Sequence, residues 1–88
     1  MSDLLKLERR LAKPYYRIGE VSKLLHEPPH TVRFWQKSFA LRDERSKKGQ
    51  RVFSRRTVAK LFAVRDLLRD WKFTIPGAKQ RLEQAVYR

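Results

Sequence analysis

Leucines recur at helical spacing in the first part of the chain. Leu4, Leu7 and Leu11 are separated by three and four residues, which places them on one face of a short amphipathic helix that Pro14 ends. A helix of about ten residues is only marginally stable alone in water. We therefore expect residues 1–14 to form an extension that docks on this domain, on a second copy of the chain or on another protein.

Two helices separated by a tight turn are predicted next. The first spans residues 18–25 and carries an apolar stripe formed by Ile18, Val21, Leu24 and Leu25. His26 is interpreted as a turn residue that can adopt left-handed geometry. Pro29 suits the first position of a new helix, which runs to about Phe39. The inward face of this second helix is formed by Val32, Trp35 and Phe39. Helix, tight turn and helix in this spacing indicate a helix-turn-helix.

The rest of the chain predicts a hairpin followed by two helices. Gly49 allows turn conformations closed to most residues, which indicates a two-stranded hairpin over residues 42–53. Ser54 is placed to cap a long helix that runs to about Trp71, and Thr74 to cap a last one. The inward residues of that last helix are Ala78, Leu82 and Val86. The aromatic residues expected in the core are Trp35, Phe39, Phe62 and Trp71. The pattern is mainly α, with about four core helices and a hairpin.

Charge changes this picture from a generic helical domain to one that binds polyanions. The 88 residues carry 22 Lys and Arg against 9 Asp and Glu, a formal net charge of +13. Solubility of a small domain needs a net charge of only about 2–8. The excess predicts nucleic acid as the partner, ahead of an anionic membrane or an acidic protein. No apolar run approaches the roughly 18 residues of a membrane span, so we expect no membrane association.

The residues that usually carry catalysis or bind metals are sparse. The chain has no cysteine, and its two histidines, His26 and His30, have no nearby pair of carboxylates. Asp43 and Glu44 are adjacent, so on an extended segment they face opposite ways and make a poor acid–base pair. No nucleophile elbow or phosphate-binding glycine loop is present. We expect neither an enzyme nor a cofactor or metal site.

Two basic elements are the candidate contacts with nucleic acid. On the second predicted helix the residues that point away from the core are His30, Arg33, Phe34 and Lys37. In a major groove an arginine can fork to guanine O6 and N7 while its neighbours hold phosphates. Residues 42–56 carry seven basic against two acidic residues, and Lys47 and Lys48 at the hairpin tip are placed to contact a phosphate backbone. Arg51 and Phe53 are two apart on a strand, which suggests a paired surface role.

Several motifs in order resemble the MerR-type winged helix-turn-helix regulators. YRIGEVSKLL at 16–25 and PHTVRFW at 29–35 resemble the helix-turn-helix. QRVFS at 50–54 is similar to the first wing, and FTI at 73–75 followed by Ala78 and Lys79 to the second wing and fourth helix. The resemblance covers about residues 15–84 and implies that 15–88 form a winged helix-turn-helix domain behind the 1–14 extension.

The resemblance implies double-stranded DNA binding in transcription regulation, usually by a homodimer, in the bacterial cytoplasm and associated with the nucleoid. It implies that Arg33 and Arg51 contact DNA, that the aromatic positions Phe34 and Phe53 help to hold the backbone, and that Arg17 lies near a phosphate. The expected DNA-binding residues are Arg17, His30, Thr31, Arg33, Phe34, Lys37, Lys47, Lys48, Arg51 and Phe53.

The chain departs from the family pattern at three places. Phe34 and Phe53 stand where tyrosine is usual, so packing replaces hydrogen bonds to phosphate. The turn at 26–28 reads His-Glu-Pro where glycine, an aliphatic residue and a capping serine or threonine are common, which predicts a distorted turn. Family members normally continue past the position of Arg88 into a coiled-coil helix and an effector domain.

Two alternatives to a transcription regulator remain. One is an architectural DNA-binding factor of the excisionase or phage-packaging type, which would bend or bridge DNA. The other is an interaction module in which the leucine helix of residues 1–14 binds a partner protein.

Overall fold

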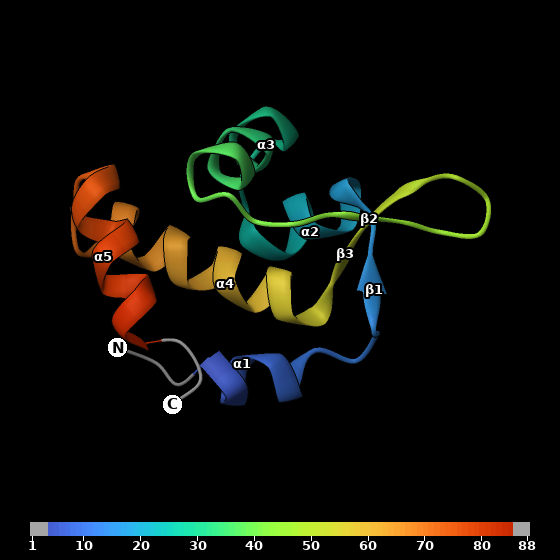
Figure 1. Cartoon of the computed structure of the whole chain (residues 1–88), viewed down its shortest axis with the longest axis horizontal. Coiled ribbons are helices and arrows are strands. Elements are labelled where there is room, and N and C mark those ends of the chain that lie inside the picture. The colour runs from blue at the N-terminus through green and yellow to red at the C-terminus, as the bar shows by residue number, and fades with distance from the viewer. Residues whose placement is uncertain (1–3, 86–88) are drawn as a thin grey trace.

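Helix α4 (Arg55–Arg65) lies at the centre of the fold, and the other helices pack around it (Figure 1). The computed structural model describes residues 4–85. The surrounding helices are α1 (Leu4–Arg10), α2 (Ile18–Leu25), α3 (Pro29–Ser38) and α5 (Ile75–Ala85). The predicted class, a mainly α winged helix-turn-helix with an N-terminal helical extension, is confirmed. None of the helices within residues 4–85 is long and apolar enough to cross a membrane.

The N-terminal helix docks on this same domain, which decides between the three expected possibilities. Leu4 is completely buried, Leu11 is buried and Leu7 packs against the core. Their contacts are with α4, and Figure 1 shows α1 along one side of α4 with α3 on the other. The leucine face is therefore occupied within the chain, and it is not available to a partner protein.

The hairpin belongs to a three-stranded sheet rather than standing alone. Strands β1 (Tyr15–Tyr16) and β2 (Glu44–Arg45) both pair antiparallel with β3 (Arg51–Ser54), in the order β1-β3-β2. Tyr16 lies opposite Phe53, and Arg45 lies opposite Arg51. The strand β1 was not predicted, because two residues after a proline are too short to show an alternating pattern. It joins the segment after α1 to the base of the hairpin.

The predicted caps begin both C-terminal helices. The Thr57 N–H donates to Ser54 Oγ at 3.2 Å at the start of α4, and the Gly77 N–H donates to Thr74 Oγ1 at 3.2 Å at the start of α5. Each hydroxyl satisfies a backbone donor that has no partner inside its helix. Ala78 and Leu82 are buried as expected. Val86, the third residue of that stripe, lies outside the described residues.

The prediction that Trp71 lies in the core is wrong. After Arg65 the helix widens into a π-helical turn, η1 (Asp66–Asp70), in which the Trp71 N–H donates to the Asp66 carbonyl at 3.0 Å. A π turn spaces hydrogen bonds five residues apart instead of four, so the stripe of an α-helix no longer holds beyond it. The Trp71 side chain is 68% exposed. Leu24, expected in the stripe of α2, is also exposed, whereas Val21 and Leu25 are buried.

Helix α3 ends in a Schellman motif built on an alanine. The Ala40 N–H donates to the Lys37 carbonyl at 3.2 Å and the Leu41 N–H to the Gln36 carbonyl at 2.9 Å, with Ala40 at φ 51°. Glycine usually occupies this left-handed position, because a Cβ atom is unfavourable there. With alanine at this position, the end of α3 is therefore less stable than it would be with glycine.

We expect Ala40→Gly to raise the free energy of unfolding by about 0.5–1 kcal/mol. Glycine adopts the left-handed conformation without strain, and it is the residue that most often follows the end of a helix. Urea unfolding followed by circular dichroism measures it. Gly49→Ala is the matched control, since Gly49 has φ 80° and its replacement should destabilise instead. Equal effects of both variants would contradict the explanation.

Candidate nucleic-acid interface

One face of α3 is anchored in the core and the other is exposed and basic. Val32 and Trp35 are buried, while His30, Arg33 and Lys37 are exposed. Within residues 4–85 none of these three side chains has an acidic partner. The Arg33 guanidinium and the Lys37 ammonium are therefore available to an external anion. The position of Thr31 is half-buried, and Phe34, with 56% of its surface exposed, lies off the buried stripe as predicted.

The turn between α2 and α3 is well formed despite its unusual sequence. His26 adopts the left-handed conformation at φ 56°, as expected, and the Glu27 N–H donates to the Ser22 carbonyl at 3.1 Å. Ser22 Oγ donates to the Glu27 carbonyl. Pro28 precedes the first residue of α3, Pro29, which needs no hydrogen-bond partner for its nitrogen. The turn is therefore held by backbone and hydroxyl contacts in the place where glycine is more usual.

Two arginines, one from α4 and one from η1, contact this turn. Arg69 donates Nε and Nη2 to the two Glu27 carboxylate oxygens at 3.1 and 3.0 Å, and its guanidinium lies 5.4 Å from the centre of the Trp35 ring. The contact with Glu27 raises the pKa of Arg69. Arg65 donates Nη1 to the Leu25 carbonyl at 3.2 Å. These contacts fix the end of α2 and the start of α3 relative to α4.

The first turn of α2 is held by a carboxylate and leaves an arginine exposed. The Arg17 N–H donates to Glu20 Oε1 at 2.9 Å, and Lys13 Nζ pairs with Glu20 Oε2. The hydrogen bond from Arg17 N–H, with the Lys13 ammonium second, holds the pKa of the Glu20 carboxyl below its usual value. Among the described residues no acidic side chain pairs with the Arg17 guanidinium, which is exposed.

The tip of the hairpin is a tight turn that presents two lysines. The Gly49 N–H donates to the Ser46 carbonyl at 2.8 Å, and Ser46 Oγ accepts from the Gln50 N–H at 3.2 Å. Lys47 and Lys48 occupy the centre of this turn and are exposed. Holding the turn by its backbone leaves both ammonium groups free to contact an anion.

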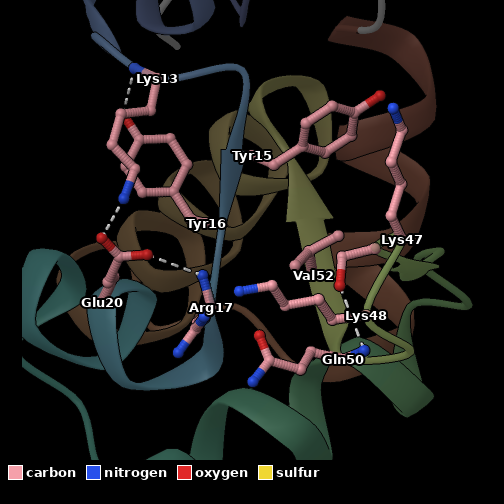
Figure 2. A pocket seen from close by; sticks show the side chains of 10 residues that line it. Lys13, Tyr15, Tyr16, Arg17, Glu20, Lys47, Lys48, Gln50 and Val52 are labelled. Carbon is pink, nitrogen blue, oxygen red and sulfur yellow. Dashed lines mark hydrogen bonds and ion pairs between the residues drawn. The ribbon is translucent and has the colours of Figure 1, made fainter.

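A cleft of about 320 Å³ lies between this hairpin and the start of α2. Figure 2 shows Lys48 extending from the hairpin toward the side of the cleft that Arg17 forms. The cleft is lined by four basic side chains and one carboxylate, together with tyrosine and amide groups: Lys13, Arg17, Lys47, Lys48, Glu20, Tyr15, Tyr16 and Gln50 among them. Since Glu20 is already bonded to Lys13, the cations of the cleft that remain for an external anion are those of Arg17, Lys47 and Lys48.

One of the expected wing contacts, Phe53, differs from the prediction, and another, Arg51, already has an ion-pair partner. The Phe53 side chain is completely buried, so it cannot contact DNA, and the paired surface role with Arg51 is wrong. Alternation along a strand predicts a shared face but does not tell which part of that face lies over the core. Arg51 is exposed, but its Nε lies 2.6 Å from Asp43 Oδ2. Contact with a phosphate would therefore compete with an existing ion pair.

Lys13, Tyr15 and Gln50 line the cleft, although no local pattern in the sequence predicts it. They come from the segment before α2 and from the hairpin, and β-strand pairing brings these together. A run of tyrosine and lysine beside a proline has no periodicity to place it in space. The residues that line the cleft come together only because β1 pairs with β3.

A comparison with family models finds one match that spans most of the chain. The model described as MerR HTH family regulatory protein matches residues 16–85. This range includes α2, the turn, α3, the hairpin, α4 and α5, and begins after the N-terminal helix. A search of curated proteins finds no match.

Proposed function

Since this chain belongs to the MerR helix-turn-helix family of DNA-binding transcription regulators, we propose that α3 enters the major groove of double-stranded DNA and that the β2–β3 hairpin lies on a neighbouring phosphate strand. The observation that carries this proposal is the exposed, unpaired basic face of α3 opposite its buried Val32 and Trp35. A groove-reading helix must be rigidly held on one side and open on the other.

Sequence is read by Arg33 in this arrangement. A guanidinium can donate two hydrogen bonds to guanine O6 and N7, a pattern that the other base pairs do not present in the major groove. His30 and Lys37 lie three and four residues from Arg33 on the exposed side of α3, where they are placed to hold flanking phosphates. Phe34 packs against sugar or a thymine methyl group.

The backbone is held in the cleft between the hairpin and α2. Arg17, Lys47 and Lys48 supply cations from its two sides, so a phosphate strand can pass between them. Such contacts release counterions and add affinity without selecting a sequence. Base reading by α3 and phosphate binding in the cleft are therefore separable by mutation.

Lys47→Ala together with Lys48→Ala should weaken binding to all duplexes alike. Each phosphate contact contributes about 0.9 to the slope of log affinity against log salt, so two lost contacts should lower that slope by about 1.8. Fluorescence anisotropy across a salt series measures it. Lys79→Ala with Arg81→Ala removes the same charge from the exposed side of α5 and should leave the slope unchanged. An unchanged slope in the hairpin variant would reject the wing contact.

Selection of bound duplexes from a random pool, with light scattering on the same sample, tests the function as a whole. A symmetric selected site bound by a dimer supports a homodimeric regulator. A single half-site bound by a monomer favours the architectural alternative. Recovery of no preferred sequence would overturn the proposal that α3 reads bases.

A further inference from the structure

The outward face of α1 carries three basic residues that the proposed interface does not use. Lys6, Arg9 and Arg10 are exposed, and their spacing of three and four residues places them together on the side opposite Leu4 and Leu11. Within residues 4–85 none of the three forms an ion pair with an acidic side chain. The helix is fixed to the domain by its leucines, so these cations have a defined place on the surface.

The neighbouring turn of α4 adds two basic residues along the edge of α1. Arg56 Nε lies 4.0 Å from Glu8 Oε1, which places this arginine beside α1. Lys60 follows one turn later on α4 and is half-exposed. We name this set of five residues the α1–α4 basic surface: Lys6, Arg9, Arg10, Arg56 and Lys60. Glu8 pairs with Arg56 from the half-buried side of α1, so the five basic residues stand against this one neighbouring carboxylate.

The α1–α4 basic surface faces away from the proposed DNA-reading side. Figure 1 shows α1 and α3 on opposite sides of α4. A duplex held by α3 and the hairpin therefore leaves this surface uncovered.

We propose that the α1–α4 basic surface binds the phosphate backbone of a second duplex segment, so that one chain bridges two stretches of DNA. The recognition is by charge alone, because the exposed side of α1 carries lysine and arginine on a helix too short to follow a groove. An anionic membrane fits less well, since an interfacial helix needs a free apolar face and α1 exposes one leucine, Leu5, while Leu4 is buried and Leu7 packs against the core.

A two-duplex capture experiment tests this inference. A short duplex with the selected site is fixed to beads and loaded with the full chain, and a labelled second duplex without the site is then added. The wild-type chain should capture the second duplex. Arg9→Gln with Arg10→Gln should reduce capture about tenfold or more at roughly 0.1 M salt, as two lost phosphate contacts imply. Binding of the first duplex should stay within about twofold of wild type.

Matched controls separate the alternatives. Lys79→Gln with Arg81→Gln removes two charges from α5 and should leave capture intact, and thermal unfolding should be unchanged in both variants because all four side chains are exposed. Unchanged capture by the α1 variant would show that bridging arises elsewhere, for example from two α3 faces in a dimer, and would overturn the inference. An equal loss of capture in both variants, or no capture by the wild-type chain, would also overturn the inference. The same holds if anionic vesicles, added in place of the second duplex, are bound through Arg9 and Arg10 while the duplex is not. Failure of the wild-type chain to bind the first duplex would instead count against the proposed function.

Discussion

Arg33→Ala should lower the affinity for the selected duplex about 5- to 150-fold and flatten the preference for guanine at one position. This range corresponds to the roughly 1–3 kcal/mol that a bidentate contact with guanine contributes to discrimination. Arg33 is exposed, without an ion pair in the described part of the chain, and lies on a helix that buried residues hold in place. Its loss therefore removes an external contact and leaves the fold unchanged.

Anisotropy titrations with the selected duplex and with single-base variants measure this effect. Arg33→Lys is the informative companion, because lysine keeps the charge but cannot form the two-pronged contact. It should retain binding to duplexes of random sequence while losing the preference for guanine. If Arg33→Ala and Arg33→Lys behave alike on every duplex, Arg33 contributes charge only and α3 does not read a base through it.

Phe53→Ala should lower the free energy of unfolding by about 3–5 kcal/mol, the range for truncating a buried phenylalanine in a core. The side chain is completely buried and lies on β3 opposite Tyr16, where the sheet meets the helices. A domain of this size has a total stability of only about 5–15 kcal/mol. The variant is therefore expected to be partly unfolded near physiological temperature, which urea unfolding measures.

Phe34→Ala provides the contrast for this variant. Its ring is mostly exposed, so its truncation should change stability by less than about 0.5 kcal/mol while weakening binding to DNA. Phe53→Tyr adds a hydroxyl at a site with no exposed surface and should also destabilise the fold. A stable Phe53→Ala variant with weakened DNA binding would mean that Phe53 acts at the surface, contrary to the structure.

The helix-turn-helix could be predicted well because its signals are local. Pro29 begins α3, Ser54 caps α4, and the spacing of Val32, Trp35 and Phe39 identifies the buried face of α3. The opposite face of α3, which carries Arg33, is then the exposed one. These are short-range effects of backbone geometry and amphipathic periodicity, so a single sequence contains them.

The parts that sequence did not reveal depend on contacts between distant segments or on irregular backbone. The Glu27–Arg69 pair joins residues 42 apart, and neither residue carries a local sign of the other. Trp71 was misplaced because the π turn of η1 changes the helical period. Phe53 was misplaced because strand alternation does not locate the edge of the core. The basic cleft depends on the pairing of β1 with β3, and a strand of two residues is too short to be recognised in the sequence.

Methylation of guanine N7 by dimethyl sulfate in the bound duplex tests the placement of α3, because N7 lies in the major groove. The wild-type chain should protect one or more guanines within the selected site, and Arg33→Ala should lose that protection even at concentrations that saturate the duplex. Full occupancy without any N7 protection, or identical protection by Arg33→Ala, would contradict the placement of α3 in the major groove with Arg33 on a base.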